Sequence, residues 1–255
     1  MKNCWIIGAS SGIGLELAKK YYSAGWNVII SARRIENLNN IQQEISVNKN
    51  LGNQIEVFAF DVVDYNNFEI STQVILQKFT KIDLVIFAPA IYNQMNLHDF
   101  DYKLALEILN VNLVSALNFL DIVGKKMIKQ NSGHIAVIAS VAGYRGLPKS
   151  FAYGASKAGL INLFEGIYPE LSANKIDLSI INPGFVATDL TAKNKFKMPF
   201  LISANKASEY IFEGLERKDF EIHFPKKFTF FMKFLRHLPN KFYLKFINYI
   251  YNKEK

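Results

Sequence analysis

Short apolar runs alternate with amphipathic stretches along most of the chain. Seven runs have the length of strands and are apolar on both faces: residues 3–7, 26–31, 55–60, 83–88, 134–139, 176–182 and 220–224. Patterns with a helical period lie between them, at residues 12–24, 35–46, 65–80, 101–129, 151–173 and 203–217. Doubly apolar strands separated by helices indicate βαβ units and a buried parallel sheet. The sequence therefore predicts an α/β fold: a doubly wound, Rossmann-type parallel sheet in a single domain over residues 1–223.

Residues 224–255 have a different pattern, which predicts a basic, aromatic-rich tail of two amphipathic helices. The first, at residues 226–238, has an apolar face formed by Phe230, Phe231, Phe234, Leu235 and Leu238. Its polar face carries Lys226, Thr229, Lys233 and Arg236. Pro239 and Asn240 interrupt the pattern. Residues 241–252 repeat it, with an apolar face of Phe242, Tyr243, Phe246, Ile247 and Ile250 against Lys241, Lys245 and Asn248.

The net charge of +8 belongs almost entirely to this tail. Residues 224–255 hold eight cations against the single acid Glu254, which gives +7 and leaves +1 for residues 1–223. Because the body lacks a basic face, we expect no nucleic-acid partner. The lone cysteine, Cys4, excludes an internal disulfide framework and fits a reducing compartment. With no secretory segment and no uncharged apolar run of ~18–20 residues, we expect a cytoplasmic protein, with peripheral contact at the inner membrane face left open.

A glycine-rich turn follows the first apolar run and opens the first helix. Gly8, Gly12 and Gly14 have the spacing GxxxGxG. A tight turn, close backbone approach and free amides at a helix N-terminus are what a pyrophosphate requires. A glycine-rich turn without a ligand is the alternative. The position between strand and amphipathic helix favours a dinucleotide, with Ser10, Ser11 and Ile13 as further contacts.

The end of the second strand predicts the type of cofactor. Ala32 stands where an acid would accept a hydrogen bond from the ribose of NAD(H), and Arg33 and Arg34 follow it. A guanidinium can donate two hydrogen bonds to a 2′-phosphate, so the sequence favours NADP(H), with NAD(H) still possible. The alternative is that both arginines are solvated loop residues. Asp61 and Val62, after the third strand, are expected at the adenine. An N-cap for the next helix is an equally good interpretation of Asp61.

Tyr153 and Lys157 are one helical turn apart and so share a face. An ammonium near a phenol lowers the pKa of the phenol from about 10, which suits it to proton transfer. Ser140 ends the preceding strand, where ligands of such sheets bind. Asn112 offers an amide for a proton-relay water. After the next strand, Thr188 can bond a carboxamide, and Pro183, Gly184 and Val186 lie beside it in sequence as further cofactor contacts.

Taken together, these residues resemble the short-chain dehydrogenase/reductase family. The motifs occur in the family's order and at similar spacings: the turn Gly8–Gly14, Asp61, Asn112, Ser140, Tyr153, Lys157 and Pro183 to Thr188. The resemblance implies a Rossmann fold, a homodimer or homotetramer, and a tetrad of Asn112, Ser140, Tyr153 and Lys157. In that tetrad Tyr153 is the acid/base, Ser140 holds the substrate oxygen, Lys157 binds the nicotinamide ribose and tunes the phenol, and Asn112 holds the relay water.

Two positions depart from the family pattern. The family's Asn-Asn-Ala-Gly after the fourth strand is here Phe87-Ala88-Pro89-Ala90, and its threonine before the first glycine is Ile7. Pro89 also removes a backbone donor. Neither change touches a group that moves a proton or hydride. We therefore expect an active enzyme with a reshaped loop, in which Ala88 still contacts the cofactor.

The substrate pocket is predicted to be apolar. The residues that indicate this are Phe196, Met198, Phe200 and Leu201 in a short lid, with Tyr144, Leu147 and Phe151 near the catalytic helix. An apolar or lipid-like ketone, aldehyde or alcohol fits such a pocket, and a 3-oxoacyl thioester is a second possibility; the alternative is that these side chains pack the core or a subunit contact. The tail has three interpretations: a membrane surface, a cover over the cleft, or a subunit contact.

Two other functions are weighed against an NADP(H)-dependent oxidoreductase acting on a carbonyl or alcohol. One is a non-catalytic, dinucleotide-sensing or scaffold module with a partner-binding tail, which only the altered loop at residues 87–90 supports. The other is an epimerase or dehydratase, for which the chain shows no extra acid/base pair beside Tyr153.

Overall fold

Within residues 1–47, 52–194 and 198–253, which the computed structural model describes, seven parallel strands form one sheet. The strand order is β3-β2-β1-β4-β5-β6-β9. The direction of the strand order reverses between β1 and β4, the switch point of a doubly wound fold. The predicted fold class is therefore confirmed. The strands are β1 (Asn3–Ile7), β2 (Asn27–Ala32), β3 (Ile55–Ala59), β4 (Leu84–Phe87), β5 (Gly133–Ile138), β6 (Ile176–Pro183) and β9 (Glu221–Phe224).

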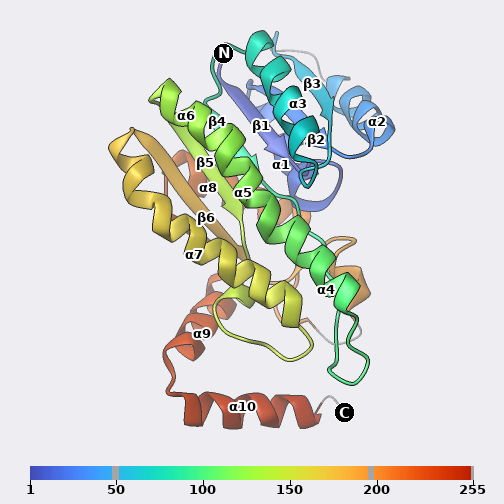
Figure 1. The fold of residues 1–255 in the computed structure, drawn as a ribbon, viewed down its shortest axis with the longest axis vertical. Helices are drawn as coiled ribbons and strands as arrows, with labels where there is room; N and C mark the ends of the chain where they lie inside the picture. Colours follow the sequence, from blue (N-terminus) through green and yellow to red (C-terminus); the bar gives the residue numbers. More distant parts are fainter. Residues whose placement is uncertain (48–51, 195–197, 254–255) are drawn as a thin grey trace.

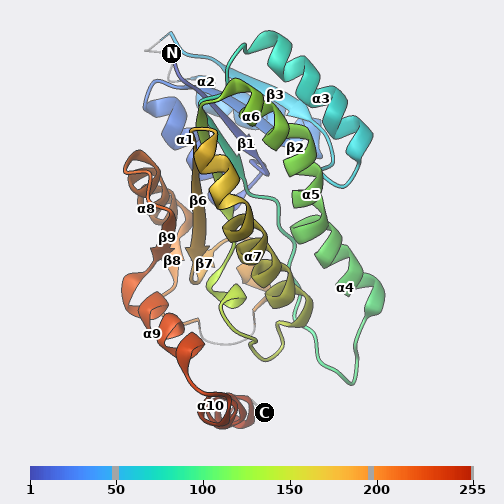
Figure 2. The same cartoon turned by 60° about the vertical axis from the view of Figure 1, so that its left-hand side comes forward.

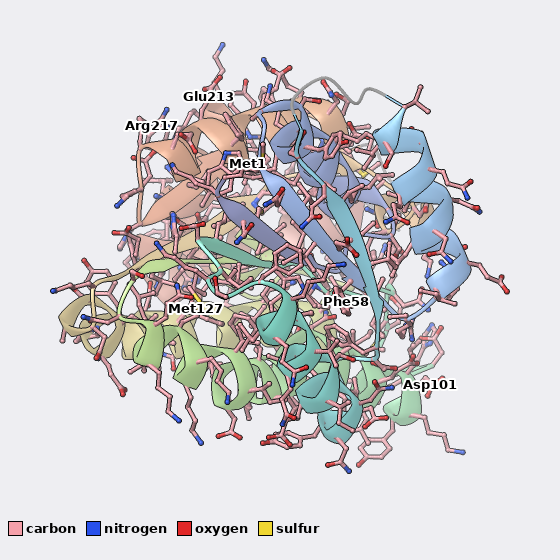
Figure 3. The ribbon with its side chains drawn as sticks, turned by 90° about the horizontal axis from the view of Figure 1, so that it is seen from above. Met1, Phe58, Asp101, Met127, Glu213 and Arg217 are labelled. Carbon is pink, nitrogen blue, oxygen red and sulfur yellow. The ribbon has the colours of Figure 1, made fainter. Side chains whose placement is uncertain are left out.

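Helices cover both faces of this sheet (Figure 1). Seen from above, the sheet lies between a layer that contains Met127 and a layer that contains Glu213 (Figure 3). The layer with Glu213 consists of α1 (Gly12–Ser23), α2 (Ile35–Ser46) and α8 (Ala204–Glu216). The layer with Met127 consists of α3 (Tyr65–Lys78), α4 (Tyr102–Leu109), α5 (Ser115–Phe119), α6 (Lys125–Gln130) and α7 (Phe151–Ala173).

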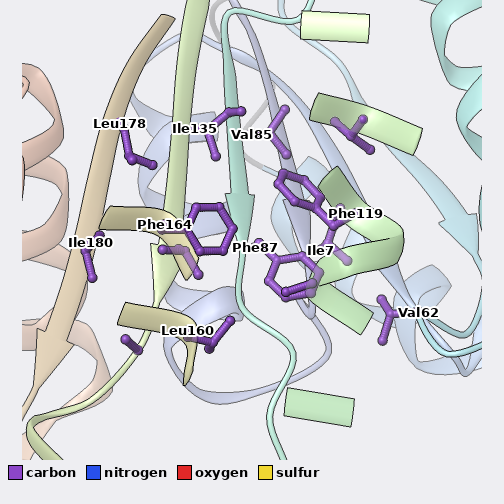
Figure 4. Close-up of a cluster of buried hydrophobic side chains, with 14 of the residues drawn as sticks. Ile7, Val62, Val85, Phe87, Phe119, Ile135, Leu160, Phe164, Leu178 and Ile180 are labelled. Atoms are coloured by element: carbon purple, nitrogen blue, oxygen red, sulfur yellow. The ribbon is translucent and has the colours of Figure 1, made fainter. Parts of the chain in front are cut away.

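Each strand supplies both hydrophobic cores because successive side chains point to opposite faces. In β1, Trp5 and Ile7 pack with the α3–α7 layer, whereas Cys4 and Ile6 pack with α1, α2 and α8. Aromatic rings fill the first of these cores, where the Phe87 and Phe119 centroids are 4.9 Å apart (Figure 4). The continuous apolar runs of the sequence thus reflect a sheet buried on both sides.

The helix predicted over residues 101–129 is a continuous helical run with two π turns. The turns η1 (Asn110–Val114) and η2 (Leu120–Gly124) separate α4, α5 and α6. By length and composition alone, the run Tyr102–Gln130 also passes as a membrane span, the one such run in the described part of the chain. Its buried residues, among them Phe119, Ile122 and Met127, pack in the core beside the sheet.

Shorter elements shape the region after β5 and β6. The 3₁₀ turn η3 (Val141–Gly143) follows β5, and η4 (Thr191–Lys193) lies in the segment after β6. A two-residue ladder joins β7 (Val186–Ala187) to β8 (Ile202–Ser203) and so holds the two ends of that segment together. The sequence did not predict this ladder, because two-residue strands carry no periodic pattern.

The tail forms helices α9 (Lys226–His237) and α10 (Asn240–Lys253), at the end of the molecule opposite the N-terminus (Figures 1 and 2). The predicted faces of α9 are wrong in part. Thr229 and Met232 are buried with Leu235, whereas Phe230, Phe231 and Phe234 are exposed. The reason is that β9 meets α9 on the Thr229 side, where the Thr229 hydroxyl lies 2.6 Å from His223 Nδ1. In α10, Tyr243 is buried as expected, but Phe242 is exposed.

Arg145 joins the tail to the loop between β5 and α7. Its guanidinium donates to the carbonyl oxygens of Leu235 and Leu238, both at 2.6 Å, and so caps the C-terminal end of α9. The same group stacks 3.8 Å from the centroid of Tyr243, whose hydroxyl donates to the Gly146 carbonyl. The tail is therefore packed into the body through this loop.

We predict that Arg145→Ala lowers the free energy of unfolding by about 1–3 kcal/mol, because the carbonyls at the end of α9 lose a charged donor and Tyr243 loses its stacking partner. Chemical denaturation of the full chain measures this. Arg217→Ala is the matched control, since Arg217 is exposed and bonds only Asp219 among the described residues. Its removal should change stability little. Equal losses in the two variants would show that Arg145 does not hold the tail.

Candidate active site

A cleft of about 490 Å³ lies along the carboxyl ends of the strands. Every residue predicted to contact the cofactor lines it: Gly8, Ser10, Ser11, Gly12, Ile13, Gly14, Arg33, Arg34, Asp61, Val62, Ala88, Tyr153, Lys157, Pro183, Gly184, Val186 and Thr188. Ser140 lines it as well. Segments far apart in the sequence, namely loops after the strands and the helix α7 (Phe151–Ala173), thus meet at one edge of the sheet.

The glycine turn has no room for side chains. A Cβ on Gly8, whose φ is 91°, would lie 2.9 Å from the carbonyl carbon of Ala88. A Cβ on Gly12, with φ 58°, would lie 3.0 Å from Thr188 Cγ2. Ser11 precedes α1 without a side-chain capping bond, so the N-terminus of α1 is left open. This is the geometry that admits a pyrophosphate close to the backbone.

Two guanidinium groups border the same cleft near β2. Arg33 and Arg34 are exposed, and neither side chain has a hydrogen-bond or ion-pair partner in the part of the chain that the structure describes.

Asp61 accepts a hydrogen bond from the Val63 amide at 3.1 Å. The N-cap of α3 is Asp64 instead, which accepts from the Asn67 amide. The interpretation of Asp61 as that cap is therefore wrong.

The catalytic end of the cleft brings η3 against α7. A Cβ on Gly143 would lie 2.7 Å from the main chain of Lys157, so only glycine permits this contact. The contact places Ser140, which precedes η3, beside Tyr153 of α7, close enough for the serine hydroxyl to lower the pKa of the phenol. Ser140 Oγ also accepts from the Ala142 amide at 3.1 Å, which fixes its orientation.

Burial dominates the titration of the tyrosine–lysine pair. It raises the pKa of Tyr153 to about 12, while the hydrogen bond with Ser140 lowers it in part. It also lowers the pKa of Lys157 to about 7. The Lys157 ammonium donates to the Ile138 carbonyl at 2.8 Å. The Lys157 ammonium does not contribute to the change in the Tyr153 pKa. The expected lowering of the Tyr153 pKa therefore does not occur, because removal of the phenol from water raises the pKa.

Asn112 lies outside the cleft lining, within the π turn η1. Its amide donates to the Ile91 carbonyl at 2.9 Å and to Ser156 Oγ at 3.1 Å, and its oxygen accepts from the Ile91 amide at 2.8 Å. Because both N–H groups are used, the side chain offers no donor for a relay water, contrary to the expectation. It instead braces the segment that follows the altered residues 87–90.

Tyr92 is a site residue that the sequence did not indicate. Its ring meets the ring of Tyr153 edge-on, with 5.0 Å between centroids, and its hydroxyl donates to Asn194 Oδ1 at 2.9 Å. It therefore connects Tyr153 to the segment after β6. The sequence could have indicated Tyr92 through its position just beyond the end of β4, because ligands of such sheets bind there.

The aromatic pocket residues inferred from sequence are not where they were expected. Among the described ones, none lines the cleft: Tyr144, Leu147, Phe151, Met198, Phe200 and Leu201. Tyr144 is buried and donates to Glu221 at 2.5 Å, which agrees with the core-packing alternative. Phe196 lies outside the described residues. The cleft has an apolar lining from other residues, among them Ile91, Tyr92, Val111 and Leu190. Of these, Tyr92 has a ring contact with Tyr153.

Known proteins are similar to this chain in sequence. A family model described as short chain dehydrogenase matches residues 2–198. The chain is 30% identical over 235 residues to an oxidoreductase of Myxococcus xanthus, which covers 92% of each chain. It is 31% identical over 197 residues to the 3-oxoacyl-(acyl-carrier-protein) reductase FabG of Thermotoga maritima, covering 75% of this chain and 77% of that one.

Solved structures agree on the fold. The alcohol dehydrogenase of the archaeon Thermococcus sibiricus, complexed with 5-hydroxy-NADP, has a TM-score of 0.79 at 21% identity and covers 88% of this chain and 96% of that one. With the family match over residues 2–198, the chain belongs to the short-chain dehydrogenase family. The resemblance stated from the sequence is thereby confirmed.

We predict that Lys157→Met raises the melting temperature by a few degrees at pH 6.5, because it removes a buried ammonium. The folded pKa is about 7 against an ordinary value of 10.5, so the penalty is complete below pH 7. Between these two pH values the unfolded chain binds more protons than the folded chain. The stability of the wild type therefore rises with pH and approaches that of the variant. Thermal melts at pH 6.5 and 9.5 measure this. A stability difference that does not depend on pH would contradict the lowered pKa.

Proposed function

We propose that this protein is an NADP(H)-dependent oxidoreductase that interconverts a carbonyl and an alcohol on an apolar substrate. The observation that carries the proposal is the meeting of Ser140, Tyr153 and Lys157 in the cleft that also contains the glycine turn. A bound nicotinamide supplies the hydride that adds to the carbonyl carbon, or accepts it in the reverse direction.

The chain's own residues would manage the proton. With a pKa of about 12, the Tyr153 phenol keeps its proton at neutral pH and so can donate it to the substrate oxygen. Ser140, which lies beside that phenol, would hold the same oxygen. The transfer leaves a phenolate, and the Lys157 ammonium, which lies 5.8 Å from the centroid of the Tyr153 ring, is a cation near it. In the direction of alcohol oxidation, the phenolate accepts the proton.

The preference for NADP(H) is supported by Arg33 and Arg34. Both line the cleft at the end of β2, and neither side chain has a partner among the described residues. An acid that would repel a phosphate is missing from this position, because Ala32 occupies it. The archaeal alcohol dehydrogenase with the same fold was solved with 5-hydroxy-NADP. A 2′-phosphate would give the two cations a ligand.

An apolar substrate is supported by apolar side chains that line the cleft. Ile91, Tyr92, Val111 and Leu190 line the cleft together with Tyr153. The likeness to a 3-oxoacyl-(acyl-carrier-protein) reductase keeps a 3-oxoacyl thioester among the candidates. A non-catalytic dinucleotide sensor is not favoured, since Ser140, Tyr153 and Lys157 all stay together at the cleft.

We also propose that the protein acts as a homodimer or homotetramer. The outer side of the α4–α5 run exposes Leu106, Val114 and Leu117, which form an apolar strip on one layer. In an oligomer, apolar helix surfaces of this kind are usually buried against a second copy of the chain.

We predict that Tyr153→Phe lowers kcat/KM for carbonyl reduction by about 10²–10⁴, since the proton donor is lost. The dissociation constant for NADPH should change little, because the ring and its packing remain. Loss of nicotinamide absorbance with a panel of apolar ketones and aldehydes measures turnover, and fluorescence titration measures binding. Tyr168→Phe is the control, as this exposed tyrosine lies outside the cleft lining. Normal turnover by Tyr153→Phe would refute the catalytic assignment.

We predict that Arg33→Ala with Arg34→Ala weakens NADPH binding by about 100-fold or more, because each charged hydrogen bond to the phosphate is worth about 1.5–3 kcal/mol and both are lost. The affinity for NADH, which lacks the phosphate, should stay within about twofold. Binding titrations with both dinucleotides measure the ratio. Equal weakening for NADH and NADPH would mean that the arginines do not select the cofactor.

A further inference from the structure

The exposed surface of α9 and α10 is unusually rich in large apolar side chains. Phe230 is 59% exposed, and Phe234 and Phe242 are each 61% exposed. Phe231 and Leu244 are also exposed. Met232, Leu235 and Tyr243 already supply the contacts that hold the two helices to the body. The Phe230 ring contacts His223 and the Phe231 ring contacts Phe246. More than half of the Phe230, Phe234 and Phe242 side chains nevertheless stays exposed, and these side chains form an apolar surface.

Basic residues are frequent in the same segment of the sequence, and one of them, Lys233, is paired with Glu221 of β9. Residues 226–253 contain Lys226, Lys227, Lys233, Arg236, Lys241, Lys245 and Lys253, and no aspartate or glutamate. Lys226 and Lys227 stand in the first turn of α9, and Lys241 in the first turn of α10. The helix dipole disfavours cations at these positions. The charges thus oppose the local stability of the helices, which points to an anionic ligand outside the protein.

The shape of this end of the molecule suits a flat surface. In both views α10 lies across the end of the molecule, and the loop before α4 extends toward the same end (Figures 1 and 2). That loop carries the exposed residues Leu97 and Phe100. A second copy of the chain is a poor occupant, because it would bring the same positive charges against one another.

We propose that the exposed aromatic and basic face of α9 and α10 docks the protein on an anionic lipid bilayer. Phenylalanine side chains enter the acyl boundary while the lysines remain among the head groups, as in peripheral amphipathic helices. Each lysine near an anionic leaflet adds to the affinity, and salt screens this part. The docking needs neither a cofactor nor a substrate, so it stands independently of the proposed oxidoreductase activity.

The test is co-sedimentation of the full-length protein with vesicles of phosphatidylglycerol and phosphatidylcholine, compared with vesicles of phosphatidylcholine alone. We expect binding to the anionic vesicles that falls as salt rises. Phe234→Ser with Phe242→Ser should weaken binding about tenfold or more, and so should Lys226→Glu with Lys227→Glu. The glutamates suit the first turn of α9, so this second variant should remain folded.

Two matched controls carry the same kinds of change elsewhere. Ile70→Ser with Val74→Ser removes exposed apolar side chains from α3, and Lys126→Glu with Lys129→Glu reverses exposed charges on α6. Both should bind anionic vesicles like the wild type, and thermal melts should show all variants folded. The proposal is overturned if the wild type does not sediment with anionic vesicles or if tail and control variants lose binding alike. It is equally overturned if the tail variants change only the oligomeric state, measured by sedimentation equilibrium.

Discussion

The burial of the Lys157 ammonium at the end of β5 is the interaction on which the catalytic end of the cleft depends. Its bond to the Ile138 carbonyl, at 2.8 Å, ties α7 to the central sheet. Because Tyr153 is one turn earlier on α7, the same bond sets the phenol beside Ser140, which directly follows β5. Gly143 permits this approach, since any side chain there would strike the main chain of Lys157. Burying an ammonium is unfavourable for folding, which is the cost of a site that must place a charge beside a phenol.

The tail and the cleft are parts of one structure. Arg145 belongs to the loop between Ser140 and Tyr153, and it holds the end of α9 through main-chain carbonyls. On the other side, Phe228 of α9 packs 5.6 Å from Phe185, beside the Pro183-Gly184 turn that lines the cleft. A ligand that binds the exposed face of α9 and α10 would therefore act on α9, which contacts two segments next to the cleft. The tail and the cleft are connected through these contacts.

Much of this architecture was readable from the sequence. The strand and helix patterns gave boundaries close to the observed ones because a sheet buried on both faces produces uninterrupted apolar runs. The glycine turn and the pair Tyr153 and Lys157 were readable because their spacing alone sets their geometry. Other features depend on tertiary contacts. The Asn112 amide donates a hydrogen bond to the Ile91 carbonyl. Thr229 is buried because β9 meets that side of α9. Burial, and not the neighbouring ammonium, raises the pKa of Tyr153. No local pattern encodes those outcomes.

The most direct test of the account is an NMR titration of the protein with ¹³C-labelled lysine side chains, with and without NADPH. We predict one lysine signal with a midpoint near pH 7, missing from Lys157→Met, that shifts when NADPH is added. Such a signal would place a buried ammonium within reach of the dinucleotide in the cleft. A Lys157 signal that titrates near 10.5, or one that ignores NADPH, would contradict it.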